Sequence, residues 1–153
     1  MYLKLFISKS IETNFYVTLD ADIIFTNKFG LSDFFNKDKG LIKIKHTADG
    51  WTKRVNKYLC INNKIRSNQT PFVFKTILVK NMFDKLNVYN YIMNKLCSEY
   101  TLFIGYLIKN KLLYDNYEDC DKYNMIGLNH KNILNKTNNE IIKFFHDNIK
   151  NSF

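Results

Sequence analysis

One segment constrains the fold of this chain more than any other, an apolar run that ends in two aspartates. Residues 15–25 read FYVTLDADIIF, so residues 15–19 lead directly into Asp20 and Asp22 before the apolar run resumes. Burying an unpaired carboxylate costs several kcal/mol or more. The pair therefore needs a cation, a network of hydrogen-bond donors, or an exit to solvent at the end of the strand.

Side chains alternate along a strand, so Asp20 and Asp22 are expected on one side and Ala21 on the other. The carboxyl end of a buried strand is where open α/β sheets bind ligands. Two carboxylates at this position suit Mn²⁺ or Mg²⁺, either of which keeps open positions for phosphate oxygens. The alternative is a strand-end pair satisfied by caps and lysines. The spacing alone is a weak signal, because Asp119 and Asp121 repeat it in a polar segment expected to be a solvated loop.

Composition predicts an α/β fold. The 153 residues include only five glycines and one proline, while 46% are hydrophobic, which favours helices and a modest sheet over a many-turned β-sandwich. The length predicts one domain over residues 1–153. Residues 15–19 are apolar on both faces, so we expect a central strand in a mixed, mostly parallel sheet flanked by helices.

Hydrophobic spacing predicts further elements. Leu3, Phe6, Ile7 and Ile11 have the spacing of a short amphipathic helix, and Ser98 is placed to cap a helix that begins at Glu99. The other predicted helices cover residues 51–59, 71–86 and 88–96, and the other predicted strands cover residues 40–44, 112–114 and 125–128.

Charge and cysteine content limit the binding partners and the cellular compartment that can be expected. The net charge is +9, but only two of the 23 basic residues are arginine, the residue that base reading and phosphate clamping favour, so no specific nucleic acid is expected. Three cysteines without a pattern fit neither a disulfide framework nor a zinc site. No apolar stretch reaches the length of a membrane span. These features predict a cytoplasmic protein.

Three segments in order, YVTLDADIIF, TPFVFKTILVKNMFDKL and SEYTLFIGYL, resemble the metal-dependent glycosyltransferases of the GT-A fold, in particular small nucleotide-sugar enzymes of viral and bacterial type. The resemblance covers about residues 3–131. It implies that Asp20 and Asp22 form the Asp-x-Asp motif, which holds Mn²⁺ or Mg²⁺ on the diphosphate of a UDP- or GDP-sugar. It also implies transfer to a glycan or protein acceptor beside Glu99 and Tyr100.

Four residues carry more specific hypotheses, each with a structural alternative. Glu99 would be the base that takes the proton of the acceptor hydroxyl, or a residue that only favours the helix start. His130 would complete the metal shell, as the resemblance implies, or be a solvated loop residue. Trp51 would stack on a sugar face or pack in the core. Pro71 would line the acceptor groove or mark a loop-to-helix junction.

The chain departs from the GT-A pattern before Asp20, where only 19 residues stand in place of a nucleotide-binding βαβ unit. The resemblance then implies an abbreviated nucleotide-binding part. A second chain or a homodimer would complete it, binding would rely on the diphosphate and metal, or the chain would be an inactive remnant.

Two other classes stay open. One is a non-catalytic or partner-dependent subunit of a glycosyltransferase. The other is a phosphatase of the haloacid dehalogenase type, which also begins with Asp-x-Asp after an apolar strand. Ile23 and Ile24 would crowd its phosphate loop, where small or hydroxylic residues are the rule.

Overall fold

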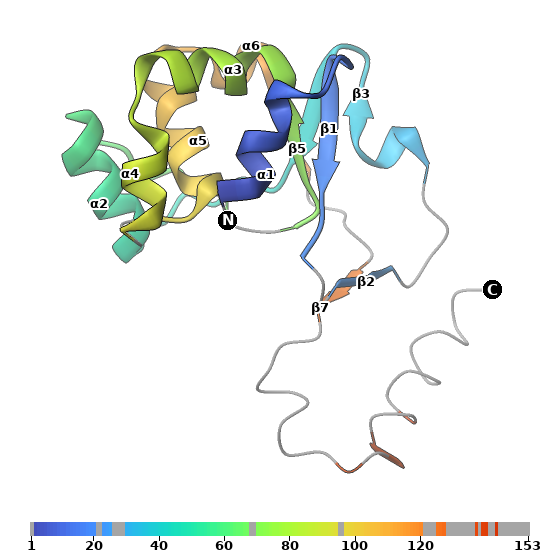
Figure 1. Cartoon of the computed structure of the whole chain (residues 1–153). Helices are drawn as coiled ribbons and strands as arrows, with labels where there is room; N and C mark the ends of the chain where they lie inside the picture. The colour runs from blue at the N-terminus through green and yellow to red at the C-terminus, as the bar shows by residue number, and fades with distance from the viewer. Residues whose placement is uncertain are drawn as a thin grey trace.

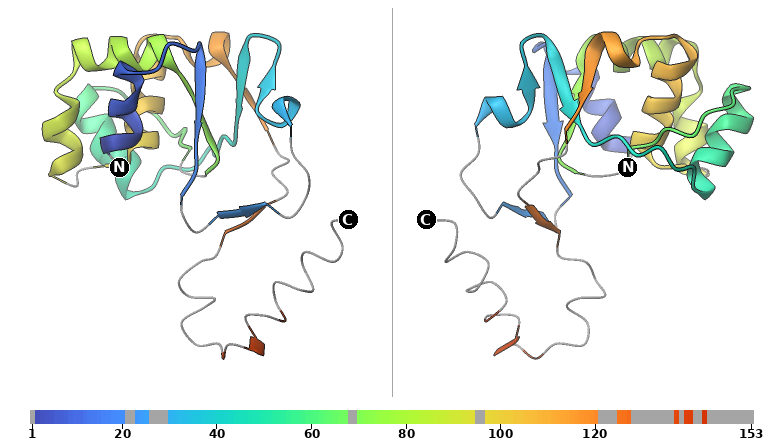
Figure 2. Two further views of the ribbon diagram at one scale, coloured as in Figure 1. Left: turned by 45° about the vertical axis from the view of Figure 1, so that its right-hand side comes forward. Right: turned by 180° about the vertical axis from the view of Figure 1, so that it is seen from behind.

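The computed structural model of the chain describes residues 2–20, 23–25, 30–67, 70–94, 97–120, 125–127, 137, 139–140 and 143. Within these ranges the longer helices gather on one side of the strands, which makes a mixed α/β arrangement (Figures 1 and 2). The α/β class predicted from the composition is therefore confirmed. None of the helices in the described ranges has the length and apolar character needed to span a membrane.

The helical elements, two of them short 3₁₀ turns (η), are α1 (Tyr2–Phe6), η1 (Ile7–Lys9), η2 (Leu31–Asp33), α2 (Gly50–Leu59), α3 (Thr76–Lys85), α4 (Val88–Met93), α5 (Glu99–Lys109) and α6 (Leu113–Asn116). The strands are β1 (Phe15–Thr18), β2 (Ile23–Phe25), β3 (Phe35–Asn36), β4 (Lys39–Ile42), β5 (Phe72–Lys75), β6 (Tyr117–Asp119) and β7 (Met125–Gly127).

The strands pair mainly in antiparallel fashion. Strand β1 runs antiparallel to β5, from Phe15 opposite Lys75 to Thr18 opposite Phe72. The pairs β2–β7 and β3–β4 are also antiparallel, and only β4–β6 among the described pairings is parallel. The described residues thus do not show the mostly parallel sheet that was expected. The apolar residues of β1 predicted a central strand with two covered faces, but all four residues of β1 are only partly buried and the described pairing of β1 is with β5 alone. Such residues also carry no information on the direction of a neighbouring strand.

Helix α5 forms the centre of the core. Every residue from Glu99 to Leu107 is buried. Its aromatic side chains meet those of β5, where the Phe72 ring stacks on Tyr100 with centroids 4.9 Å apart and Phe74 lies edge-on to Phe103 at 5.2 Å. This packing holds the start of α5 beside the end of β5.

Helix α2 packs against α5 through a glycine. A Cβ atom added at Gly105 would lie 2.4 Å from Val55 Cγ1, so only glycine permits this approach of the two helices. Val55 itself is buried. The close approach fixes the position of α2, which carries Trp51, relative to α5, which begins at Glu99.

Several predicted elements are correct. The predicted elements over residues 15–19, 51–59 and 125–128 overlap β1, α2 and β7, and α5 begins at Glu99 as expected. Two predictions are wrong. Residues 112–114 overlap α6, not a strand, and residues 72–75 form β5 before the helix that was expected from residue 71 begins at Thr76. Phe72, Val73 and Phe74 are all fully buried, and such a run does not distinguish a strand from a buried helix.

The predicted N-terminal helix exists as α1 and η1, but much of its apolar stripe is exposed, although the Phe6 ring packs against Tyr2 and Phe83. Leu3, Phe6 and Ile7 are 76%, 41% and 49% exposed, whereas Leu5 and Ser8 are buried. The inward face of α1 is therefore the one that also carries the half-buried Lys4.

Candidate functional site

A pocket of about 450 Å³ lies at the end of the molecule where β1 ends and α5 begins. The described residues that line it are Lys4, Asp20, Trp51, Ser98, Glu99, Tyr100 and Thr101. They come from α1, the end of β1, α2 and the first turn of α5. Figure 1 shows the N-terminal end of α1 and the carboxyl end of β1 at the same side of the molecule. Four residues singled out in the sequence (Asp20, Trp51, Glu99 and Tyr100) thus meet at one cavity.

Asp20 follows β1 and points toward α1 and α5. Lys4 Nζ donates a hydrogen bond to Asp20 Oδ1, and Thr70 Oγ1 donates to Oδ2 at 3.3 Å. The Tyr100 hydroxyl also donates to Oδ1, at 3.5 Å. The Asp20 side chain is 43% exposed, so it is reachable from solvent as well as paired. This is the arrangement expected from the alternative in which a lysine satisfies the strand-end carboxylate.

Lys4 joins the two acidic residues of the pocket. Its Nζ lies 3.3 Å from Glu99 Oε1 and donates to the Tyr100 hydroxyl at 2.6 Å, in addition to its bond with Asp20. Burial would lower the pKa of Lys4, but the hydrogen bonds with Asp20 and Tyr100 and the charge of Glu99 outweigh burial and raise it. Lys4 therefore stays an ammonium ion at physiological pH.

Glu99 is the first residue of α5 and is only 2% exposed. The N-cap of this helix is Ser98, whose Oγ accepts a hydrogen bond from Thr101 N at 3.2 Å, as the sequence predicted. Since Ser98 supplies the side-chain cap, Glu99 is available to the pocket, where it forms an ion pair with Lys4. The helix start also favours its negative charge.

Tyr100 connects Lys4 and Asp20 through one hydroxyl, which accepts a hydrogen bond from the first and donates to the second. Burial raises the pKa of Tyr100 to about 12, against the opposing effect of Lys4. The hydroxyl therefore keeps its proton at neutral pH and remains a donor toward the pocket.

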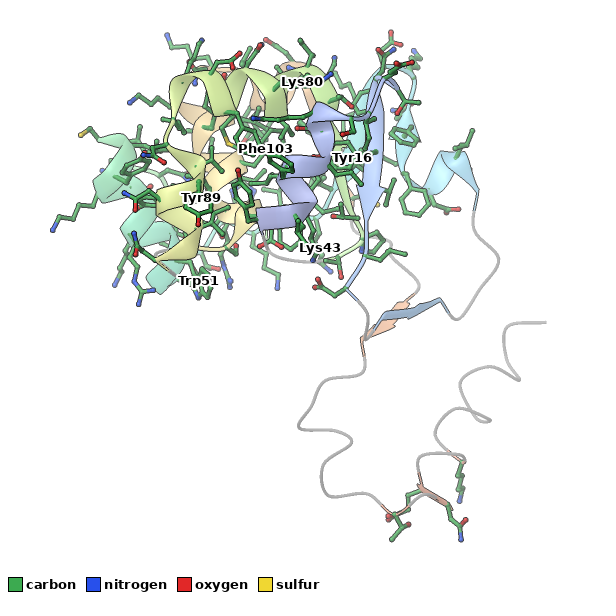
Figure 3. All side chains as sticks on the ribbon, viewed as in Figure 1. Tyr16, Lys43, Trp51, Lys80, Tyr89 and Phe103 are labelled. Atoms are coloured by element: carbon green, nitrogen blue, oxygen red, sulfur yellow. The ribbon has the colours of Figure 1, made fainter. Side chains whose placement is uncertain are left out.

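Trp51 is the second residue of α2 and lines the pocket while also packing against the core, so both sequence interpretations describe part of its environment. Figure 3 shows it at the end of α2 that faces the same side of the molecule as the end of β1. The start of α2 is fixed by Asp49, whose Oδ1 accepts from Thr52 N at 2.8 Å and whose Oδ2 pairs with Arg66 at 2.7 Å.

The other predicted site residues are not brought to the pocket by the described part of the chain. Pro71 is buried next to Thr70 and is not among the described lining residues. Asp22 and His130 lie outside the described residues, and so does Asp121 of the second Asp-x-Asp pair. Its partner Asp119 ends strand β6, where it is exposed and its Oδ1 accepts a hydrogen bond from Ile44 N at 2.8 Å.

Within the described ranges no group of three or more His, Cys, Asp or Glu side chains is placed to hold a metal ion. Asp20 and Glu99 nevertheless direct carboxylate oxygens at one cation, the Lys4 ammonium. Oxygen donors around a positive charge fit the ligand preference of Mg²⁺ and Mn²⁺. Completing a metal site here would require Asp22, His130 or a bound ligand.

Sequence reasoning missed Lys4 and Thr70. The burial cost of Asp20 indicated that a cation or donors must lie nearby, which both residues confirm. Nothing in the spacing distinguishes Lys4 from the other lysines, because it is separated from Asp20 by a turn and a whole strand.

The fold and the pocket define an α/β protein with an acidic, aromatic-lined cavity built around the half-buried ammonium group of Lys4. The chain belongs to a protein family of unknown function, DUF6492, whose family model matches residues 1–144. No curated protein matches the chain, and no solved structure matches it either.

Proposed function

We propose that the chain is a glycosyltransferase that moves a sugar from a UDP- or GDP-sugar to the hydroxyl group of a glycan or protein acceptor. The observation that carries the proposal is the meeting of Asp20, Glu99 and Trp51 at one pocket, although up to 79 positions separate them in the chain. The resemblance to GT-A enzymes implies a metal role for Asp20 and an acceptor role for Glu99, and the aromatic ring of Trp51 could stack on the sugar. One cavity is what a transfer between two bound substrates requires.

The donor diphosphate would be held through Mn²⁺ or Mg²⁺ on Asp20 together with Asp22 and His130. When bound, such an ion neutralises the charge that develops on the diphosphate leaving group. Trp51 would offer an apolar ring face to the sugar, and the Tyr100 hydroxyl would hold Asp20 in place.

Glu99 would accept the proton of the acceptor hydroxyl while that oxygen forms its bond to the anomeric carbon and the bond to the diphosphate breaks. Its burial keeps bulk water away from the carboxylate, and the Lys4 ammonium 3.3 Å away compensates its charge between turnovers. A base in this position goes with inversion at the anomeric carbon.

The experiment is calorimetry of the purified chain against a panel of UDP- and GDP-sugars, with and without Mn²⁺, followed by a transfer assay. Binding that needs Mn²⁺ and transfer that Asp22→Asn abolishes without unfolding support the proposal. Glu99→Gln should lower kcat more than donor affinity. An equal loss of both would assign Glu99 to positioning, and normal transfer by Asp22→Asn would refute the metal role.

The contact between Lys4 and Asp20 favours a second candidate, a non-catalytic or partner-dependent subunit, because Asp20 already has a cation. Transfer activity that appears only with a second protein, or never, would support it. A phosphatase is less well supported, since Ile23–Phe25 belong to strand β2 and leave no loop of small residues there. Release of inorganic phosphate from a generic phosphomonoester would revive that class.

A further inference from the structure

The ammonium group of Lys4 contacts three of the polar groups that line the pocket. A lysine has three N–H donors, and those of Lys4 face Asp20 Oδ1, the Tyr100 hydroxyl at 2.6 Å and Glu99 Oε1 at 3.3 Å. All three partners line the same cavity. One positive charge therefore serves two carboxylates, and the described charged groups of the pocket sum to a net negative charge.

The two carboxylates cannot both lose this cation without a replacement. The Glu99 side chain is 3% exposed, so water compensates little of its charge. Asp20 is 43% exposed and can still reach an ion from the open side. A divalent ion arriving on Asp20 would stand within a few ångströms of the Lys4 ammonium, where the two positive charges repel each other in a partly desolvated site.

We propose that Lys4 is the internal counter-cation of this pocket and competes with a divalent ion for Asp20. The inference rests on the proposed function in taking Asp20 as a metal ligand. In the metal-free protein Lys4 holds the carboxylates together; when an ion binds, the ammonium leaves Asp20 and remains in the pocket as a positive group for an anionic ligand. Lys4 is thus a positioning residue that sets how strongly the site takes a metal.

The first test compares Mn²⁺ affinity, measured by calorimetry and by the decrease of the free Mn²⁺ electron paramagnetic resonance signal, for wild type, Lys4→Met and Lys53→Met. Lys53 is an exposed lysine on α2, two residues from Trp51, so its replacement removes the same charge near the pocket without removing the contact. Lys4→Met should bind Mn²⁺ at least tenfold more tightly than wild type, and Lys53→Met within about twofold.

Thermal unfolding gives a matching readout. Without metal Lys4→Met should melt below wild type, and Mn²⁺ should raise its Tm by more than it raises that of wild type, because the ion replaces the lost cation. Equal Mn²⁺ affinities in Lys4→Met and wild type would overturn the inference, as would equal Mn²⁺-induced Tm shifts.

A second measurement uses the unmodified chain, in case Lys4→Met does not fold. Mass spectrometry after brief acetylation reports the reactivity of each lysine. Mn²⁺ should increase the labelling rate of Lys4 several-fold and leave that of Lys53 unchanged, since the displaced ammonium loses its contact with Asp20. Unchanged Lys4 labelling at saturating Mn²⁺ would overturn the inference.

The outcomes separate this inference from the proposed function. Tight Mn²⁺ binding by Lys4→Met with no sugar transfer by any variant would remove the transferase and keep the role of Lys4. Metal-dependent transfer combined with an unchanged Mn²⁺ affinity in Lys4→Met would support the transferase and refute the role of Lys4.

Discussion

Replacing Gly105 by alanine tests whether the contact between α2 and α5 shapes the pocket. The added methyl group would lie 2.4 Å from Val55 Cγ1 and 3.0 Å from Leu59 Cδ1, both in buried side chains. Val55 is β-branched and has little freedom to rotate away on a helix. The two helices must therefore separate, or Val55 must leave its preferred rotamer.

The expected loss of stability follows from two opposing effects. Adding a methyl group to a packed core costs about 1 to 3 kcal/mol, and replacing glycine by alanine inside a helix returns about 1 kcal/mol. Because the approach is so short and Val55 so stiff, we place the packing cost at its upper end. The net loss is then about 2 kcal/mol, which lowers Tm by about 4 to 8 °C for a chain of this size.

Urea and thermal unfolding of Gly105→Ala measure this loss, with Gly50→Ala as the matched control. Gly50 begins α2, and a Cβ atom there would meet nothing within 4 Å, so its replacement should leave stability unchanged or slightly raised. Val55→Ala should rescue Gly105→Ala in part, because the new methyl group fills space that the shorter side chain leaves. The loss in the double variant should fall at least about 1 kcal/mol short of the sum of the single losses.

A Gly105→Ala protein as stable as wild type would refute the reasoning, and so would losses that add without coupling to Val55→Ala. A functional readout accompanies the test, since the contact also sets the distance between Trp51 on α2 and Glu99 on α5. Any ligand found for the pocket should bind more weakly to Gly105→Ala than to Gly50→Ala.

Two further predictions concern single hydrogen-bonding groups. Burial would raise the pKa of Asp49, but hydrogen bonds from Thr52 and the charge of Arg66 lower it below its unfolded value near 3.8, so the stability that Asp49 contributes is present above about pH 4 and is lost as pH falls through the lower folded pKa. Asp49→Asn keeps an N-cap and should weaken the acid dependence of stability measured by urea unfolding. An unchanged pH profile would contradict this prediction. Tyr117→Phe removes the buried hydroxyl that accepts a hydrogen bond from Lys75 N at 2.8 Å, and it should lower the free energy of unfolding by about 1 to 2 kcal/mol, measured by thermal unfolding. An unchanged Tm would show that the Lys75 amide does not need this acceptor.

Local signals in the sequence were enough for the elements whose information is local. Ser98 followed by an acidic residue and an apolar run specifies the start of α5, and the structure shows the Ser98 cap. The same reasoning gave the wrong prediction for strand β5. Phe72, Val73 and Phe74 are all buried, by β1, α5 and their neighbours, so they show no hydrophobic period that would identify a strand. Strand direction also depends on tertiary pairing, which explains why a mostly parallel sheet was expected where the described pairings are mainly antiparallel.

The candidate site also has a part that local sequence predicts and a part that only the tertiary structure decides. Asp20, Trp51 and Glu99 could be selected from the sequence because each has a local reason to stand out, as a carboxylate at a strand end, the lone tryptophan after a turn, and an acidic residue at a helix start. Their meeting at one pocket is a tertiary fact that no local pattern contains. Asp22 and His130 lie outside the described residues, so their part in the site stays a prediction.

The sequence nevertheless predicted one physical requirement of the site, the compensation of a carboxylate charge. A carboxylate at the edge of a core needs compensation, and the sequence could state this need without naming the group that meets it. Lys4 meets it, from the same inward face of α1 that buries Leu5 and Ser8. The burial of Leu5 and Ser8 fixes the orientation of α1, and this orientation brings the Lys4 ammonium within reach of Asp20, a tertiary relation that the local sequence pattern does not contain.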